Sequence, residues 1–569
     1  MTTKFEDVAH QSFDYVIAGG GTAGLTLATP QEYADGIEMQ WPRGKGLGGS
    51  SSINFFGFGK PPAEDINDFE RLGNPGWNWE HLNSAMHKLE GFVRPSEEML
   101  ARTQSRVGLW QLGTEGPLKI TFPPVINAVD GITLFNLGIP PAPNPASSSC
   151  KGAYLGPNTH DPRTYTRSYA TTAFYLPNKD RPNLHVLTFA HVVRVVTEPT
   201  ASGDLVATGV EFLHDGKTYV ANANKEVILS AGALKSPQIL ELSGIGDPKV
   251  LDKINVPVKV NLPGVGSNVQ DHALIPVGYE LKDNAAFETF DLLSDPAVAE
   301  EHLQLHNTLQ GLHTQGVVGY AFCSLDMVTD KAEKMYIATK ETITKRLPSC
   351  SPGLQDQYKV ELDRLRFGRP VVEILTFPGN ISKPNPPTPG KKHISLHAGN
   401  HHCLSRGTIH CTTNDPLQDP EFDPHYFEED IGTLIRNCGP YIMSEKRKKP
   451  DLQILVEAVH FIRKAVATSP LKEIVAREVN PGPLAEPGNE EQMRTWIRRN
   501  FYSPWHTSSS CSMLPREKGG VVDPSLKVYG TTNLRVVDLS IIPIHIAAHT
   551  QAIVYGIAAR AADIITEAA

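Results

Sequence analysis

The sequence predicts an α/β protein, α+β overall, in which a Rossmann-like dinucleotide-binding domain is interleaved with a second domain. The first observation is the apolar, β-branched run 13–18, which leads directly into the glycine-rich turn Gly19-Gly20-Gly21-Thr22-Ala23-Gly24. The second is a strand-and-helix pattern at 226–243 that returns to the same sheet. The third is the length, because 569 residues exceed one ordinary core and favour two domains that share a cleft.

The glycine-rich turn has the G-x-G-x-x-G spacing that binds the pyrophosphate of a dinucleotide. Gly19, Gly21 and Gly24 suit this task because the backbone must turn tightly, approach the phosphates closely and begin a helix whose N-terminal amides attract an anion. The same spacing also occurs in turns of other folds that bind nothing. The strand directly before the turn favours the dinucleotide interpretation.

Further strands and one helix follow in the first half of the chain. The runs 186–188, 192–196 and 226–230 are rich in β-branched residues and predict strands of the first domain. The last of these runs is followed by a turn and a helix that ends near Ser243-Gly244, where glycine favours a helix end.

The second half contains a long middle block and a segment that returns to the first domain. The block has a mixed pattern with a Pro-rich, extended loop at 383–389, and we assign it to substrate enclosure. Residues 552–569 have helical periodicity. We therefore expect a first domain over 13–282, a substrate domain over 283–498 and a returning C-terminal segment over 499–569.

Composition and charge exclude several classes of protein. Hydrophobic residues make up 40% of the chain and charged residues 20%, as in globular proteins. A net charge of -9 argues against a nucleic-acid or anionic-membrane partner. The first ten residues have no apolar signal-peptide core, and no segment has the uncharged length of a membrane helix. Together with seven scattered cysteines, these features predict a cytoplasmic protein without disulfides.

Six histidines and cysteines cluster in the sequence and raise the question of a metal site. They are His397, His401, His402, Cys403, His410 and Cys411. Their spacing fits no standard zinc pattern, and the alternation of 407–412 predicts a strand that turns the last two to opposite faces. We predict no metal site.

Two histidines near the C-terminus are candidate bases. His506 follows Trp505, and His549 lies in the segment Ala548-His549-Thr550-Gln551. Oxidation of an alcohol requires removal of the hydroxyl proton, and the pKa of histidine lies closest to neutral pH. The plainer interpretation is a buried histidine that is only hydrogen-bonded.

Two stretches resemble, position by position, the signature patterns of the glucose-methanol-choline (GMC) family of flavin oxidoreductases. The first is 44–54 (Gly44 to Asn54) and the second is 232–246 (Gly232 to Gly246). The segments 262–272 and 534–540 are similar to further family segments. The resemblance extends from about residue 13 to the C-terminus.

This resemblance implies an FAD-binding domain, a substrate domain built on an antiparallel sheet and an FAD-dependent alcohol dehydrogenase or oxidase. His506 matches the family's general base and His549 its second catalytic position. The implied substrate is a small, apolar or aromatic alcohol of secondary metabolism, while the electron acceptor is not identified. The implied cofactor-binding residues are Gly19, Gly21, Gly24, Gly48, Gly49, Ser50, Asn54, Val192, Asp538 and Leu539.

The mode of flavin attachment follows from one position. Some members of the family attach the flavin covalently through a histidine at the position of Ile53. Isoleucine cannot form such a bond, so the FAD is expected to be non-covalent.

The chain departs from the family directly after the glycine-rich turn. A dinucleotide-binding domain continues there with a helix, a second strand and an acidic residue that holds the ribose. Only 16 residues, Leu25 to Gln40, separate the turn from Trp41, Pro30 interrupts the helix, and 31–38 has no strand alternation. We therefore expect a deletion between residues 29 and 41 and no ribose-binding carboxylate. Glu38 lies at a similar distance from the turn in the sequence, but nothing else supports it as a substitute.

Two other functions remain open at this point. The deletion favours a flavin-deficient pseudoenzyme or binding protein of the same family. The scaffold also supports hydroxynitrile lyases, which keep the flavin without using its redox chemistry. Flavin content tests the first alternative and product analysis tests the second.

Overall fold

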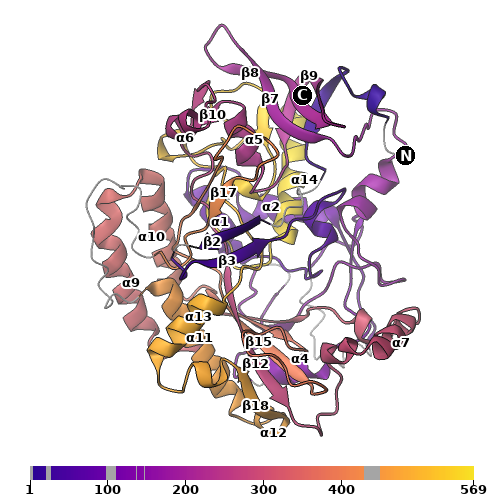
Figure 1. The fold of residues 1–569 in the computed structure, drawn as a ribbon, viewed down its shortest axis with the longest axis vertical. Helices are drawn as coiled ribbons and strands as arrows, with labels where there is room; N and C mark the ends of the chain where they lie inside the picture. The colour runs from indigo at the N-terminus through magenta and orange to yellow at the C-terminus, as the bar shows by residue number, and fades with distance from the viewer. Residues whose placement is uncertain are drawn as a thin grey trace.

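Two large sheets lie at opposite ends of the molecule, as the computed structural model shows (Figure 1). The structure describes residues 4–20, 27–31, 33–97, 111–135, 137–145, 148–428 and 449–568. Gly21 and Gly24, two of the expected pyrophosphate contacts, lie outside the described residues. Both bodies of the expected fold are present, a mixed α/β layer and an antiparallel sheet.

The first sheet has the order β1-β9-β8-β7, and β19 also pairs with β9. Its strands are β1 (Ser12–Ala18), β7 (His191–Pro199), β8 (Leu205–His214), β9 (Lys217–Leu229) and β19 (Leu534–Val536). β1 and β19 run parallel to β9, whereas β7, β8 and β9 form an antiparallel meander. The expected strands at 13–18, 192–196 and 226–230 are confirmed.

The parallel strands place three loops at one edge of this sheet. Ala18 pairs with Leu229, and Leu229 also pairs with Val536, so the residues that follow β1, β9 and β19 leave the sheet together. Gly19 has φ +126°, and a Cβ on it would lie 2.4 Å from the carbonyl oxygen of Ser230. Only glycine fits there, which explains the first glycine of the turn.

Helices from distant parts of the chain cover the first sheet and its loops. α5 (Ser236–Leu242) packs on β7 and ends at Ser243, as expected from the sequence. α14 (Gln551–Ala568) confirms the expected C-terminal helix and packs on α2 (Trp79–Leu89). α1 (Ala63–Arg71) packs on α2, and α6 (Pro248–Lys253) packs on α5.

The second sheet is antiparallel and has the order β18-β12-β15-β14-β13-β6. Its strands are β6 (Gly152–Leu155), β12 (Ala273–Leu281), β13 (Gly319–Cys323), β14 (Val372–Phe377), β15 (His393–Asn400) and β18 (Val475–Asn480). β6 and β12 both precede residue 283 and still belong to this sheet, so the two bodies are interleaved. The central strands are buried on both faces because helices cover them.

Helices on the second sheet enclose it from several directions. α11 (Pro450–Val466) packs on β15, β12 and β14 and is itself covered by α13 (Glu490–Asn500). α4 (Ala128–Phe135) contacts β13, β6 and β14. The pair α9 (Ala332–Arg346) and α10 (Pro352–Arg366) forms the side of the molecule seen at the left of Figure 1, and α7 (Pro296–His306) lies at the other side.

One expectation for local structure is wrong and two others are confirmed. Residues 186–188 form no strand and belong to the irregular segment before β7. The Pro-rich stretch 383–389 is extended and irregular, as expected. Two short strands, β16 (Thr408–His410) and β17 (Glu421–Asp423), form a separate pair that confirms the alternation of 407–412.

The segment after the glycine turn folds differently from the expectation. β2 (Leu27–Gln31) and β3 (Ile37–Trp41) form an antiparallel hairpin that lies between the two sheets (Figure 1). Pro30 is accommodated because a two-stranded hairpin has free edges that need no N–H donor. Met39 and Trp41 are buried while their neighbours are exposed, so strand alternation is present but begins only at Ile37.

The hairpin leaves β1 at the edge of the first sheet. β1 pairs with β9 on one side, and among the described strands none pairs with its other side. Ile17 lies near the end of this strand, and its side chain is 60% exposed. A second strand would pair here in a complete dinucleotide-binding sheet. The structure therefore agrees with a deletion of that strand, although the residues that remain are a hairpin and not a broken helix.

Candidate active site

The loop 43–57 contains the first signature stretch. It contacts the glycine turn at its centre and the residues around the two candidate bases at its ends. The N–H of Gly48 donates to the carbonyl of Gly20 at 2.9 Å. Gly48 and Gly49 have φ +90° and +51°, and a Cβ on Gly48 would lie 2.5 Å from the ring of Tyr169. Larger residues are excluded at this position, so the two glycines keep the loop close to the turn.

The far end of this loop is held by an arginine. Arg167 donates to the side-chain oxygen of Asn54 at 2.6 Å and to its carbonyl at 2.8 Å, and it lies over the ring of Phe56 at 3.8 Å. The hydroxyl of Ser50 accepts from the N–H of Gly44 at 3.3 Å. Ser50 and Asn54 thus fix the shape of the loop, in addition to any contact with a cofactor.

The second signature stretch meets the segment after β19. One carboxylate oxygen of Asp538 accepts from the N–H of Gly232 at 2.9 Å and from the hydroxyl of Ser236 at 2.5 Å. The other oxygen accepts from the N–H of Ser540 at 2.8 Å, and the carbonyl of Leu539 accepts from the N–H of Ser509 at 3.4 Å. Val192 lies apart from this contact, in β7, which β9 and β8 separate from β1.

His506 and His549 lie next to each other. Their ring centroids are 5.1 Å apart and their planes are inclined by 60°. The loop 43–57 flanks both, since Arg43 donates to the hydroxyl of Thr507 at 2.9 Å and a Cβ on Gly57 would lie 3.7 Å from Nδ1 of His549. The two histidines are 43 residues apart in the sequence, and the fold makes them neighbours.

A buried aspartate holds the loop that carries His506. One oxygen of Asp271 accepts from the N–H of His506 at 3.1 Å. The other oxygen accepts from the side chains of Ser503 and Thr507, both at 2.8 Å, and from the indole N–H of Trp41 at 3.2 Å. Four donors from two segments thus converge on one carboxylate, which restricts the position of His506.

A second buried carboxylate pairs with His549. Glu373 in β14 contacts Nε2 of His549 at 2.9 Å and Nε2 of His401 at 2.8 Å. Burial raises the pKa of Glu373, but His549 and His401 outweigh it and hold the pKa below its usual range. Burial likewise opposes the charged form of His549, yet Glu373 raises the pKa of His549 above its ordinary value. The structure therefore favours a Glu373 carboxylate paired with a His549 imidazolium.

His506 has the opposite electrostatic character. Burial lowers the pKa of His506 well below its ordinary value, and the neighbouring positive charge of His549 lowers it further. The pKa values of the two neighbouring imidazoles are thus shifted in opposite directions. A neutral His506 can accept a proton, and a charged His549 can stabilise a negative charge beside it.

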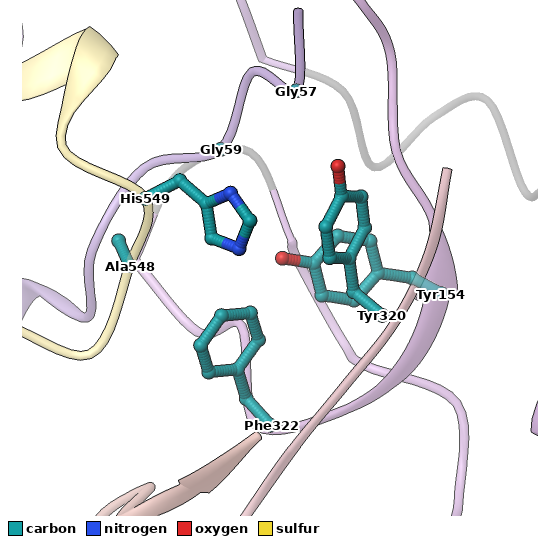
Figure 2. Close-up of a pocket in the computed structure, with 7 residues that line it drawn as sticks. All are labelled: Gly57, Gly59, Tyr154, Tyr320, Phe322, Ala548 and His549. Carbon is teal, nitrogen blue, oxygen red and sulfur yellow. The ribbon is translucent and has the colours of Figure 1, made fainter. Parts of the chain in front are cut away.

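Aromatic side chains line a small pocket beside His549 (Figure 2). Its volume is about 10 Å³, about the space of one water molecule. In Figure 2 the imidazole of His549 points towards the rings of Tyr154 and Tyr320, with Phe322 below. The rings of Tyr320 and His549 make an edge-on contact with centroids 5.4 Å apart, and the hydroxyl of Tyr320 donates to the carbonyl of Val317 at 2.7 Å. The walls that face His549 are therefore mostly apolar.

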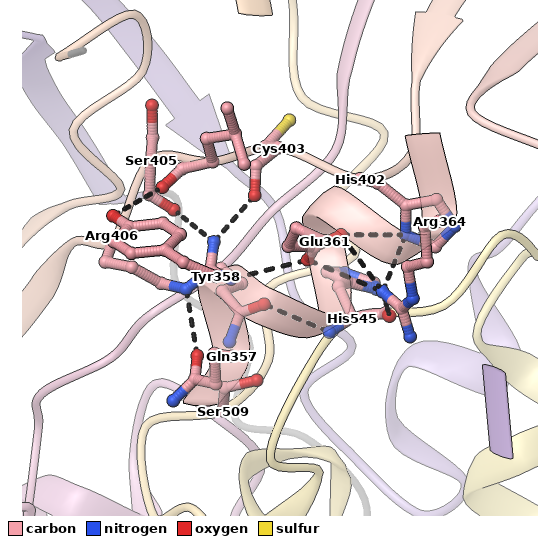
Figure 3. A network of polar contacts seen from close by, with 12 residues as sticks. Gln357, Tyr358, Glu361, Arg364, His402, Cys403, Ser405, Arg406, Ser509 and His545 are labelled. Atoms are coloured by element: carbon pink, nitrogen blue, oxygen red, sulfur yellow. Dashed lines mark hydrogen bonds and ion pairs between the residues drawn. The ribbon is translucent and has the colours of Figure 1, made fainter. Parts of the chain in front are cut away.

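A buried ion network fixes the loop before His549 (Figure 3). Arg364 in α10, fully buried, donates to the carbonyl of His545 at 2.9 Å and contacts Nδ1 of His402 at the same distance. It also pairs with Asp68 at 3.0 Å, while Asp65 in α1 accepts from the N–H of Ala547 at 2.7 Å. The charges of this network therefore bear directly on the backbone that leads to His549.

The clustered histidines of 397–411 bond to separate partners. His401 pairs with Glu373, His402 with Arg364, and His410 with Glu241 at 2.6 Å. Within the described ranges, no group of three possible ligands could hold a metal ion. The partners come from different elements, so each histidine is used separately.

Asp271, His272 and Glu373 were not identified as site residues from the sequence. The first two belong to the family segment 262–272, which marks the resemblance without a stated role. Glu373 is the only charged residue in strand β14, and this isolated charge is the signal that could have indicated it.

Comparison with known proteins agrees with this geometry. The two family profiles described as GMC oxidoreductase match residues 13–274 and 404–558. The GMC oxidoreductase family protein Mala s 12 of Malassezia sympodialis is 32% identical over 619 positions, covering 98% of this chain and 93% of that protein. Dehydrogenase citC of Monascus ruber is 30% identical, covering 99% and 97%. The first alignment is longer than the 569-residue chain, so it contains gaps in this chain.

Solved structures have the same fold. An FAD-dependent oxidoreductase from Chaetomium thermophilum superposes with a TM-score of 0.83 at 25% identity, covering 98% of this chain and 99% of that chain. A fungal aryl-alcohol oxidase also has a TM-score of 0.83, at 24% identity with the same coverage. Within the described residues, no helix has the length and apolar character needed to span a membrane. The chain belongs to the GMC oxidoreductase family and is an FAD-dependent dehydrogenase or oxidase.

Proposed function

We propose that the chain oxidises a small alcohol of apolar or aromatic character and that His506 takes the hydroxyl proton. One observation carries this proposal: neutral His506 lies 5.1 Å from His549, which is paired with Glu373 and faces an aromatic pocket.

The residues that surround the two histidines fit a bound flavin. Ile53 and Phe55 are 51% and 59% exposed, and Phe55 stacks on Trp505 with centroids 6.3 Å apart. A planar ring held against the loop 48–55 would remove this apolar surface from water. The backbone at Gly19 and Gly48 would hold the phosphates, and Asp538 and Leu539 would hold the adjoining part of the cofactor. FAD, when bound there, supplies the acceptor for the hydride.

The two histidines have complementary tasks. His506 is uncharged at neutral pH, so one ring nitrogen can accept the hydroxyl proton while the C–H bond of the carbinol is broken. His549 carries the positive charge that Glu373 stabilises, and this charge favours the developing alkoxide at the same oxygen. Loss of either group should therefore slow the chemical step more than substrate binding.

The pocket and the relatives together support the substrate class. Tyr154, Tyr320 and Phe322 offer apolar faces and edges, and among the polar groups that line the pocket His549 is the charged one. The aryl-alcohol oxidase has the same fold, and dehydrogenases citC and xptC are relatives of the chain. We therefore propose a benzylic or other apolar primary alcohol, in secondary metabolism, with non-covalent FAD.

Anaerobic reduction of the flavin tests the proposal. The protein, loaded with FAD, is mixed with a panel of benzylic and aliphatic alcohols, and the loss of flavin absorbance is recorded. A benzylic alcohol should reduce the flavin fastest, and His506→Ala should lower that rate about 100-fold or more with flavin still bound. A panel that never reduces the flavin, combined with cleavage of a cyanohydrin, would favour the lyase instead. Near-normal reduction by the His506→Ala variant would remove His506 from the mechanism.

A further inference from the structure

We propose that His272 is a positioning residue that accepts a hydrogen bond from Nδ1 of His506 and so leaves Nε2 of His506 free to take the substrate proton. The inference rests on the proposed role of His506 as the base. It assigns to the end of the 262–272 segment a function in the reaction.

The geometry places the two imidazoles in direct contact. Nδ1 of His272 lies 2.9 Å from Nδ1 of His506, and the ring planes are inclined by 86°. A contact of this length between two nitrogens requires one proton between them. Burial lowers the pKa of His272 well below its ordinary value, with His401 the next cause, and the pKa of His506 is lowered as well. Both rings are neutral, so the contact holds a single proton.

His272 itself cannot move. It is fully buried between two other imidazoles, with ring centroids 3.9 Å from His401 and 3.7 Å from His545. Its carbonyl accepts from the hydroxyl of Tyr426 at 3.2 Å, and its N–H donates to Asp271 at 2.8 Å. Asp271 also accepts from the N–H of His506, so one dipeptide fixes both the backbone and the ring of the base.

Only one placement of the shared proton is compatible with catalysis. If His506 donates from Nδ1, its Nε2 has a free lone pair, and the imidazolium formed after proton transfer keeps its hydrogen bond to His272. If His272 donates instead, Nε2 of His506 already carries a proton and cannot accept another. The orientation of the base therefore depends on His272 remaining an acceptor.

The hydrogen bond ends at His272. As an acceptor at Nδ1, neutral His272 carries its own proton on Nε2, which is buried and has no hydrogen-bond partner, so a proton received by His506 has no onward route through this ring. His272 therefore anchors the base and does not relay the proton. Other titratable or charged groups face this cluster from several elements: Glu373, Asp271, His401, His402, His545, His549 and Arg364.

Two substitutions separate anchoring from simple packing. His272→Phe keeps a ring of similar size but removes the acceptor. His272→Asn keeps an acceptor, since the side-chain oxygen of asparagine occupies nearly the position of Nδ1. His397→Phe is the control, because His397 is also buried in the second sheet but bonds to Tyr502 and not to His506.

We expect His272→Phe to lower kcat by about 10- to 100-fold, the usual effect of losing a partner that orients a functional histidine. The KM and the flavin content should change less than about twofold, since His272 lies behind the base. His272→Asn should recover most of kcat, and His397→Phe should leave it unchanged. A second measurement needs no flavin: ¹⁵N NMR of histidine-labelled protein should show His506 protonated at Nδ1, and a mixture of tautomers in His272→Phe.

Three results would overturn the inference. They are an unchanged kcat in His272→Phe, an equal loss in His272→Phe and His272→Asn, and an NMR spectrum of the unaltered protein in which His506 is protonated at Nε2. The last measurement decides the matter even where the phenylalanine variant folds poorly. His506→Ala separates the two proposals, because full activity of that variant refutes the base itself, whereas an inactive His506→Ala with an active His272→Phe refutes only the role of His272.

Discussion

At the scale of single residues, the two histidines differ in charge because of what surrounds them. Both are buried and adjacent, yet only His549 has a carboxylate bonded to its ring, whereas Asp271 bonds to the backbone N–H of His506. The pKa of His549 is raised and that of His506 is lowered, so one fold keeps one ring charged and the other neutral. Glu373 therefore accounts for the opposite pKa shifts on which the proposed roles of the two histidines depend.

Removal of the charge of Glu373 should change the pH dependence of turnover. The charged form of His549 is present below its raised pKa and is lost as the pH rises through it, while the lowered pKa of Glu373 keeps the carboxylate charged down to acidic pH. In Glu373→Gln only burial remains, and it lowers the pKa of His549. The alkaline limb of the profile of kcat/KM should therefore move to lower pH.

The control for this variant is Glu241→Gln, which breaks another buried Glu–His pair at a different site. The profile of this control should keep its alkaline limit. An unchanged limit in Glu373→Gln, measured over the same pH range, would show that His549 needs no charge for turnover.

Ile53 makes a second prediction at this scale. Its side chain has no nucleophilic atom, and in the structure it lies at the end of a short helical turn of residues Gly49–Ser52 with half of its surface exposed. We expect all bound flavin to appear in the supernatant after acid or heat precipitation, measured by its absorbance. Flavin that remains with the precipitated chain would contradict this expectation.

The histidine pair was predictable from the sequence through its resemblance to a family, whereas its environment was not. Glu373 and His272 lie in β14 and just before β12, far from His506 in sequence, and no local pattern indicates that a sheet brings them together. For Val192, the local structure was predictable but the contact with a ligand was not. Its strand was predicted correctly, but a strand assignment does not place a residue relative to a ligand.

At the scale of elements, sequence patterns succeeded where one local preference dominates. The β-branched runs of β1 and β9 and the periodic helix α14 are confirmed. The hairpin β2–β3 was missed because the window 31–38 includes its turn, which hides the alternation of Glu38, Met39, Gln40 and Trp41. Buried Trp41 then connects the hairpin to the site, since its indole donates to the carboxylate of Asp271.

Trp41 should therefore matter for both stability and activity. The side chain is fully buried and packs edge-on against Phe422 with centroids 4.8 Å apart. Trp41→Ala should cost about 3–5 kcal/mol of folding free energy, the usual range for deletion of a buried aromatic side chain. Urea unfolding, followed by circular dichroism, measures the shift in midpoint.

The matched control for Trp41 is Phe189→Ala, because the side chain of Phe189 is 91% exposed. The control should shift the midpoint very little. Equal midpoints for Trp41→Ala and the unaltered chain would show that the hairpin does not contribute to the cooperative fold.

At the scale of the whole molecule, the two large sheets meet at the group of histidines around His506. The first sheet supplies the loops after β1, β9 and β19, and the second supplies Glu373 and His401. α1 and α10 connect them through the buried pairs of Arg364 with Asp68 and Asp65. Because a buried charge without its partner is costly, this network favours a single relative placement of the loop before His549.

The incomplete edge of the first sheet leads to the last prediction, which concerns FAD binding by the whole chain. β1 has no second neighbour among the described strands, Ile17 is exposed there, and Glu38 lies on a hairpin bonded to itself and not to β1. The loop 43–57, the histidine pair and the pocket are present, so we expect any loss of FAD binding to arise at the ribose end of the site. We predict that the native transcript encodes a helix end, a strand and an acidic residue near Thr29.

The present chain should then lose most of its flavin on gel filtration, whereas the chain with the added segment should retain about one FAD per molecule. Sequencing the transcript across Thr29 and measuring flavin content by absorbance check both parts. An uninterrupted transcript identical to this sequence, whose protein keeps stoichiometric flavin, would show that the ribose needs neither the second strand nor its carboxylate.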